Sequence, residues 1–172
     1  TAGVYLLVRS APVLEEALTV TSTLMTVPTE PDETVILPHT VADAPAAPEL
    51  EARMLMLVNQ ERAAVGLAPL EMDPELTEIA RAHSADMFAR GYFSHTTPEG
   101  LSPFDRIQAG GVRYLVAGEN LAHTATLLTA HEGLMNSPGH RANILNPAFG
   151  RVGIGILDGG FYGVMVTQNF RD

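Results

Sequence analysis

His95, Glu119 and His140 are the residues of this sequence whose types best support chemistry. The chain of 172 residues contains six histidines and no cysteine, and all ten of its basic residues are arginine, which excludes thiolate and lysine nucleophiles. Each of the three residues lies at or near the end of an expected element, where sites are often built. Two imidazoles and one carboxylate form a known zinc ligand set that leaves a position for water. Because the three residues lie far apart in the sequence, the alternative to a shared site is that they are unrelated polar residues.

The other candidates favour ordinary structural roles. His131-Glu132 begins like a zinc-protease helix, but Met135 stands where the second histidine is required. Ser137 precedes a proline, so its type and position favour helix capping over nucleophilic catalysis. His83 lies on the apolar face of an expected helix, which favours a buried histidine bonded to the backbone. No Gly-x-Ser-x-Gly segment is present.

The composition limits the classes of partner. The net charge of −10 argues against a general nucleic-acid binder and against attachment to an anionic membrane surface. A hydrophobic fraction of 46% is enough for a core, whereas no apolar stretch is long enough to cross a bilayer. The chain begins at Thr1, so we expect any targeting segment or membrane tether to lie upstream of residue 1.

The sequence divides into two regions of different composition, and His95, Glu119 and His140 all lie in the second. Residues 1–48 are rich in proline and acidic side chains, which predicts a linker or short helical adaptor, with one short helix over Pro12–Val27 and an extended stretch over 29–47. Residues 49–172 have the apolar periodicity of a folded domain. The predicted organisation is therefore an N-terminal linker followed by one α+β domain.

Apolar spacing and capping residues predict the elements of the domain. The expected helices cover 50–65, 74–90, 103–109, 126–135 and 138–145. A strand is expected over Val112–Ala117, and a terminal hairpin pairs 152–156 with 161–170 through a glycine-rich turn. Gly153 and Gly155 share one face of the first hairpin strand, which predicts that another element packs very close there.

Several ordered motifs resemble the CAP superfamily, which groups cysteine-rich secretory proteins, antigen 5 and pathogenesis-related 1 proteins. The matching segments are Gly91–His95, Gly118–Ala122, Asn136–Leu145, Val152–Gly155 and Thr167–Phe170. The form without cysteine resembles the bacterial SCP domain, and the resemblance covers roughly residues 50–171. It implies a three-layer α-β-α sandwich with a central, mostly antiparallel sheet. It also implies a cleft with two histidines and two acids, which binds a divalent metal such as zinc in some members.

Carried over by motif, the resemblance implies cleft residues His95, Glu119, Ser137 and His140, and metal ligands His95, His140 and Glu119. Leu134 stands where the family has a tryptophan, so Ser137 takes the position of the second acid. The loss of this anionic ligand lowers the expected zinc affinity.

The resemblance implies an extracytoplasmic protein, secreted or tethered at the cell surface. We expect a binding or adaptor module for a metal, a small lipid or a peptide. A metal-dependent, protease-like hydrolase and a structural surface module are the alternatives, and the oligomeric state is not predicted.

Overall fold

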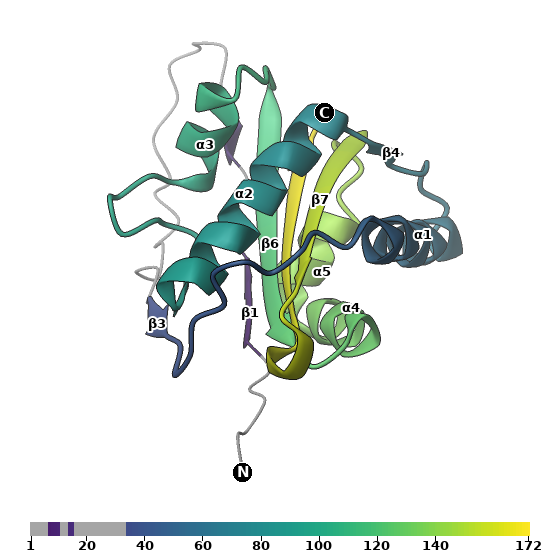
Figure 1. Cartoon of the computed structure of the whole chain (residues 1–172). Coiled ribbons are helices and arrows are strands. Elements are labelled where there is room, and N and C mark those ends of the chain that lie inside the picture. Colours follow the sequence, from purple (N-terminus) through teal and green to yellow (C-terminus); the bar gives the residue numbers. More distant parts are fainter. Residues whose placement is uncertain (1–6, 11–13, 16–33) are drawn as a thin grey trace.

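The computed structural model of the protein describes residues 7–10, 14–15 and 34–172 (Figure 1). Its strands are β1 (Leu7–Ser10), β2 (Leu14–Glu15), β3 (Val35–Ile36), β4 (Glu71–Met72), β5 (Tyr92–Phe93), β6 (Val116–Thr124), β7 (Arg151–Asp158) and β8 (Val164–Arg171). Its helices are α1 (Pro48–Ala64), α2 (Pro74–Arg90), α3 (Pro103–Ala109), α4 (Leu127–Asn136), α5 (Pro138–Ile144) and the short 3-10 helix η1 (Gly160–Tyr162). Among the described helices, none is long and apolar enough to cross a membrane.

A six-stranded sheet forms the middle of the molecule. Its strand order is β1-β6-β8-β7-β4, and β2 also pairs with β6. The pairs of β6, β8 and β7 are antiparallel, as are those of β1 and β2 with β6, whereas β4 runs parallel to β7. The hairpin of β7 and β8 is the one that the sequence predicts, and the mostly antiparallel sheet is as the family resemblance implies.

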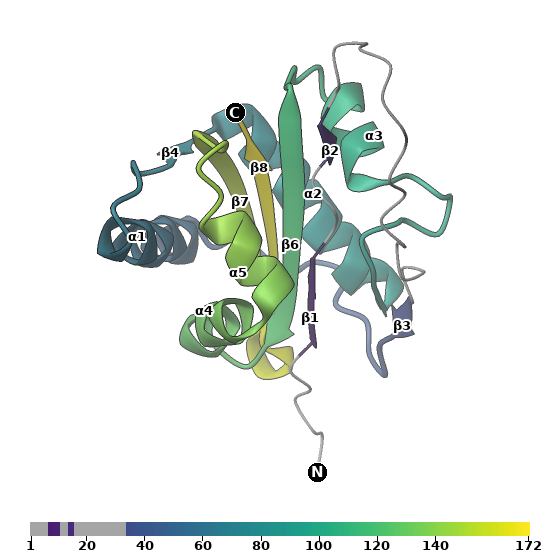
Figure 2. The same cartoon turned by 180° about the vertical axis from the view of Figure 1, so that it is seen from behind.

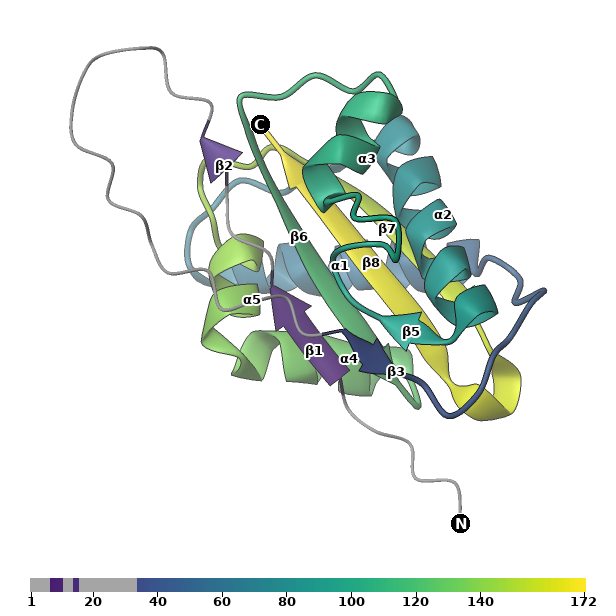
Figure 3. The same ribbon diagram turned by 90° about the vertical axis from the view of Figure 1, so that its left-hand side faces the viewer.

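Helices cover both faces of this sheet. The helices α2 and α3 lie on one face, and α1, α4 and α5 lie on the other (Figures 2 and 3). Apolar side chains of α1, α4, β7 and β8 form the larger core, and a smaller core lies between α2, α3 and β6. This arrangement confirms the three-layer α-β-α sandwich.

The helix α2 packs against β7 with almost no space between the two backbones. A Cβ atom added to Gly153 would collide with the backbone of Leu76, and one added to Gly155 would collide with the backbone of Ala80. The hydroxyl of Ser84 donates to the carbonyl of Gly155 at 3.0 Å. The close approach that the two glycines predict is therefore confirmed.

Local capping chemistry starts α2 and α3 where the sequence predicts. At the start of α2, Oδ1 of Asp73 accepts a hydrogen bond from the backbone N–H of Leu76 at 3.2 Å. At the start of α3, Ser102 and Asp105 form a reciprocal capping box. Gly91 ends α2 with a φ of 67°, a conformation that favours glycine.

The position of β6 differs from the sequence prediction. We expected a strand over Val112–Ala117, but β6 covers Val116–Thr124. Polar residues such as Asn120 interrupt the apolar pattern of this segment, and they are nevertheless buried because partners on other elements satisfy them. The last strand also begins later than expected, since Gly160–Tyr162 forms η1.

Described parts of the N-terminal region pair with the domain. Most of the helix predicted over Pro12–Val27 lies outside the described residues, and Leu14–Glu15 within it is a strand. Val35–Ile36 pairs with β5, and the backbone N–H of Ala47 donates to the carbonyl of Ile156 at 2.9 Å. Residues 34–47 thus run along the domain and are bonded to it.

Candidate functional site

Glu119 and His95 make the central contact of the candidate site. Glu119 lies in the middle of β6 and is completely buried, while His95 follows β5 by two residues. The Nδ1 atom of His95 lies 2.8 Å from Oε1 of Glu119. A long buried strand thus fixes the carboxylate, and the carboxylate orients the imidazole.

Arg106 on α3 is the cationic partner of this pair. Its Nη2 donates to Oε2 of Glu119 at 2.7 Å, and its Nη1 donates to the carbonyl of His95 at 2.6 Å. Burial raises the pKa of Glu119, but the charge of Arg106 and the hydrogen bond from His95 outweigh it and lower the pKa to about 2. Sequence analysis missed Arg106, and the only available signal was that a buried carboxylate requires a cation.

Ser137 and His140 form the second part of the site. Ser137 occupies the N-cap position of α5, but its side chain makes no capping hydrogen bond, so the predicted capping role is not observed. Its Oγ lies instead 2.7 Å from Nδ1 of His140. The hydroxyl therefore orients the ring of His140 in the first turn of α5.

Buried amides connect the two parts. The Nδ2 atom of Asn120 donates to the carbonyl of His140 at 3.1 Å, and Nδ2 of Asn143 donates to Oδ1 of Asn120 at 2.9 Å. The fold thus brings together residues that are far apart in the sequence. Burial lowers the pKa of His140 to about 3, and the charge of His95 contributes to the same shift.

The two imidazoles each present one unpaired nitrogen. The Nε2 atoms of His95 and His140 are buried, and the structure gives neither a hydrogen-bond partner. Because the ionised carboxylate of Glu119 can only accept, the Nδ1 atom of His95 donates the hydrogen of this bond. The site therefore contains two buried polar atoms that a ligand could satisfy.

The hydrogen bonds of the predicted zinc ligands leave an incomplete ligand set for a metal ion. In the part of the chain that the structure describes, no three or more histidine or acidic side chains are arranged to hold a metal ion. Both carboxylate oxygens of Glu119 are already bonded, to His95 and to Arg106. A zinc site with an open position takes three protein ligands, and the two Nε2 atoms alone fit this requirement incompletely. Zinc binding remains a prediction.

Two further histidines have structural partners. The Nε2 atom of His83 lies 2.9 Å from the carbonyl of Ser94, as expected for a buried histidine bonded to the backbone. Burial lowers the pKa of His83 to about 4. His131 lies in α4, with its Nε2 3.4 Å from Oε1 of Glu61.

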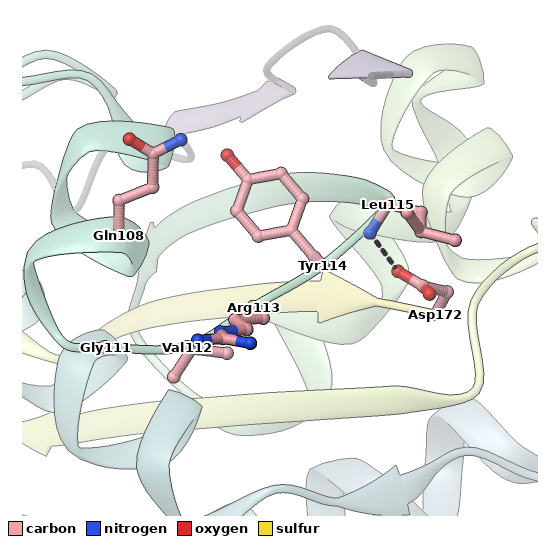
Figure 4. A pocket seen from close by; sticks show the side chains of 7 residues that line it. All are labelled: Gln108, Gly111, Val112, Arg113, Tyr114, Leu115 and Asp172. Atoms are coloured by element: carbon pink, nitrogen blue, oxygen red, sulfur yellow. Dashed lines mark hydrogen bonds between the residues drawn. The ribbon is translucent and has the colours of Figure 1, made fainter. Parts of the chain in front are cut away.

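Two surface hollows of the described residues have linings that do not include His95 or His140. The larger, of about 680 Å³, is lined by Gln108, Gly111, Val112, Arg113, Tyr114, Leu115 and Asp172 (Figure 4). Oδ1 of Asp172 accepts from the backbone N–H of Leu115 at 2.7 Å and so closes one side. A smaller hollow of about 360 Å³ lies between α4 and α5. We assign the candidate site to the histidines.

Relatives of known sequence share the domain. The chain is 41% identical over 124 residues to YkwD of Bacillus subtilis, covering 71% of this chain and 48% of that protein. It is 40% identical over 121 residues to YlbC of the same organism, described as a membrane protein, covering 70% of this chain and 34% of that protein. The chain thus spans about half or less of the length of these relatives.

Solved structures share the fold. An extracellular protein containing an SCP domain from Bacillus anthracis superposes with a TM-score of 0.64 at 33% identity, over 75% of this chain and 45% of that chain. An outer surface protein from Borrelia burgdorferi superposes with a TM-score of 0.70 at 20% identity, over 76% of this chain and 98% of that chain. The family model of the cysteine-rich secretory proteins matches residues 55–170, and the chain therefore belongs to the CAP family.

Proposed function

We propose that this CAP domain is an extracytoplasmic binding module whose cleft holds a segment of polypeptide through the Nε2 atoms of His95 and His140. One observation carries the proposal, namely that both atoms are buried and unpaired while the remaining nitrogen of each ring is held by a neighbour. A buried polar atom without a partner costs about 1–3 kcal/mol, and a ligand that satisfies it recovers that free energy.

The chemistry of the two nitrogens favours a neutral ligand that both donates and accepts. When the ring of His95 is neutral and its Nδ1 donates to Glu119, its Nε2 offers a lone pair. His140 offers an N–H at Nε2 when the hydroxyl of Ser137 donates to its Nδ1. A peptide group carries one N–H and one C=O and complements this pair. The lowered pKa of His140 keeps its ring neutral at physiological pH, which removes the attraction for an anion.

Selection from a display library of random peptides of about twelve residues tests this function on the full chain. We expect selected peptides to bind, and His95→Ala or His140→Ala to weaken their binding at least about tenfold, which corresponds to about 1.4 kcal/mol. His131→Ala is the matched control, because it removes a buried histidine outside the site. Circular dichroism would check that each variant is folded.

Two outcomes would contradict peptide binding. The first is that no peptide is enriched over an unrelated domain. The second is that the selected peptides bind the His95→Ala and His140→Ala variants as well as they bind the wild-type chain. The second outcome would favour a structural surface module, because the cleft would then contribute nothing to recognition.

Zinc is the second candidate ligand, favoured by the two unpaired imidazole nitrogens. Calorimetric titration of the full chain with zinc tests it. We expect weaker binding than at a site with three protein ligands, because Glu119 reaches a metal only by giving up a bond to His95 or Arg106. Submicromolar binding that His140→Ala abolishes would establish a metal site instead.

The hydrolase alternative is less well supported by the chemistry of the site. A pKa of about 3 makes His140 a weak base toward the nearby hydroxyl of Ser137. Location outside the cytoplasm is supported by the extracellular relative from Bacillus anthracis. Digestion by a protease added to intact cells of the source organism tests the location, and a protein that stays intact until the cells are lysed would overturn it.

A further inference from the structure

Arg62 is a buried cation whose partners are backbone carbonyls. It lies in the last turn of α1, and only 1% of it is exposed. In the described part of the chain, every hydrogen bond that its guanidinium donates goes to a carbonyl oxygen. A buried charge is costly unless the protein compensates it. The dipoles of these carbonyls therefore hold the cation in place.

The guanidinium joins the end of α1 to the end of α5. Its Nη1 donates to the carbonyls of Ile144 and Asn146, each at 2.9 Å. Its Nη2 donates to the carbonyl of Phe149 at 3.2 Å, and its Nε donates to that of Ala68 at 2.8 Å. The first three carbonyls belong to the end of α5 and to the loop that leads from α5 to β7.

The helix α5 depends on such contacts because it is short. It has seven residues, and a helix of this length is marginal by itself, so contacts with other elements determine where it lies. Its last carbonyls have no partner within the helix and carry a negative partial charge. Arg62 satisfies the carbonyl of Ile144 and brings the opposite charge to this end.

The end of α5 that Arg62 holds is close to the cleft. Ile144 follows His140 by four residues, which is about one turn of helix. The carbonyl of His140 accepts from Nδ2 of Asn120 on β6 at 3.1 Å. The helix is thus attached to β6 at His140 and to α1 at Ile144, and a shift at the second attachment moves the imidazole.

The carbonyl of Phe149 gives Arg62 a second connection to the site. The ring of Phe149 stacks on that of Phe170, with centroids 5.3 Å apart. It also packs on β6, because a Cβ atom added to Gly118 would lie 3.1 Å from its Cζ. Gly118 directly precedes Glu119, the carboxylate that orients His95. One guanidinium therefore contacts both the helix of His140 and the residue that packs beside Glu119.

We propose that Arg62 is a positioning residue of the histidine cleft, whose guanidinium holds α5 where His140 can meet a ligand together with His95. The proposal rests on the proposed function for the use of the cleft, whereas the placement of α5 needs no ligand. An arginine suits this role because its planar fork of five donors reaches several carbonyls at once. A lysine keeps the charge but has one ammonium group on a flexible stem, so it cannot replace all four bonds.

Chemical modification of Arg62→Lys in the full chain tests the proposal. The probe is diethyl pyrocarbonate, which acylates accessible neutral imidazoles, and mass spectrometry of peptides gives the rate at each histidine. The measured quantity is the ratio of the rate at His140 to that at His83, since both are buried in the wild type, at 3% and 1% exposed. We expect Arg62→Lys to raise this ratio at least about tenfold, the effect of losing one charged hydrogen bond.

Asp73→Ala is the matched control, because it weakens the domain at the start of α2 rather than at α5. A general loss of stability opens His83 as well as His140, so we expect the control not to raise the ratio. An unchanged ratio in a folded Arg62→Lys variant would overturn the proposal, because Arg62 would then contribute to stability without placing His140.

Amide hydrogen exchange of the wild type answers the question if Arg62→Lys does not fold. At the end of α5, the N–H of Leu145 donates to the carbonyl of Arg141 at 2.9 Å. If the guanidinium ties the two helices, the amide of Leu145 and that of Arg62 should open together, with the same dependence on urea. Opening of Leu145 at lower urea than Arg62 would overturn the proposal.

This proposal and the proposed function can fail separately. If selected peptides need His95 and His140 but bind Arg62→Lys as tightly as the wild type, and the ratio is unchanged, the proposed function stands and the role of Arg62 is wrong. If the ratio rises while no peptide is enriched, Arg62 positions His140 and peptide binding is wrong.

Discussion

Replacement of Arg106 by methionine removes the charge that keeps Glu119 ionised inside the protein. Methionine retains much of the apolar stem, so the change is mainly the loss of the guanidinium. The side chains of Arg106 and Glu119 are 11% and 0% exposed, and the pair is separated by 2.7 Å. The variant therefore leaves a buried carboxylate without its cation.

The expected cost follows from two independent arguments. Breaking a buried ion pair by removing one partner costs about 3–5 kcal/mol. Separately, the lowering of the pKa of Glu119 from 4.5 to about 2, to which Arg106 contributes most and His95 next, corresponds to about 3 kcal/mol of stability at neutral pH. We therefore expect Arg106→Met to lose about 3 kcal/mol, or about 6–12 °C in Tm.

Urea denaturation of four proteins would measure this cost and locate its origin. The set comprises the wild type, Arg106→Met, Glu119→Gln and the double variant, with the exposed Arg113→Met as control. The double variant should lose less than the two single variants together, because removing the carboxylate also removes the unpaired charge. The gap between the wild type and Arg106→Met should narrow as pH falls from 4.5 toward 2, where Glu119 becomes protonated in the folded state. A loss below about 1 kcal/mol, or simple additivity, would refute the pairing argument.

Three further changes test the packing and the electrostatics. Gly155→Ala should destabilise the domain by more than about 2 kcal/mol, because the backbone of α2 leaves no room for a Cβ atom. Gly150→Ala is the control and should cost little, because its Cβ atom would have its nearest contact at 3.9 Å. Thermal melts of the two variants test this difference. Asp73→Ala should lose the cap of α2 and the ion pair with Arg171, about 1–2 kcal/mol by urea denaturation. Burial lowers the pKa of His83 to about 4 and that of His140 to about 3, so the unfolded chain takes up protons first. The stability that these neutral buried histidines contribute should be fully present above pH 6.5 and should decrease as the pH falls toward 4. Urea midpoints that stay constant over this range would contradict the burial of these histidines in the neutral form.

Local chemistry made much of the fold predictable. The starts of α2 and α3 are set by Asp73 and Ser102, whose side chains cap their own helices, so the sequence alone contains the signal. The hairpin and the close approach at Gly155 were also predictable, because alternation and missing side chains are visible without tertiary information. The extent of β6 was not, since the partners of Asn120 come from α5 and β8.

The same distinction applies to the candidate site. The motifs identified His95, Glu119 and His140, but the sequence could not indicate that Arg106 takes one oxygen of the carboxylate. Nor could it show that the hydroxyl of Ser137 turns toward His140 instead of capping α5. The contact of Arg106 with Glu119 joins two elements, α3 and β6, that meet only after folding, whereas Ser137 and His140 lie three residues apart at the start of α5. The contacts of Glu119 also change the expected chemistry. Its carboxylate positions His95, and it can bind a metal only by giving up its bond to His95 or to Arg106.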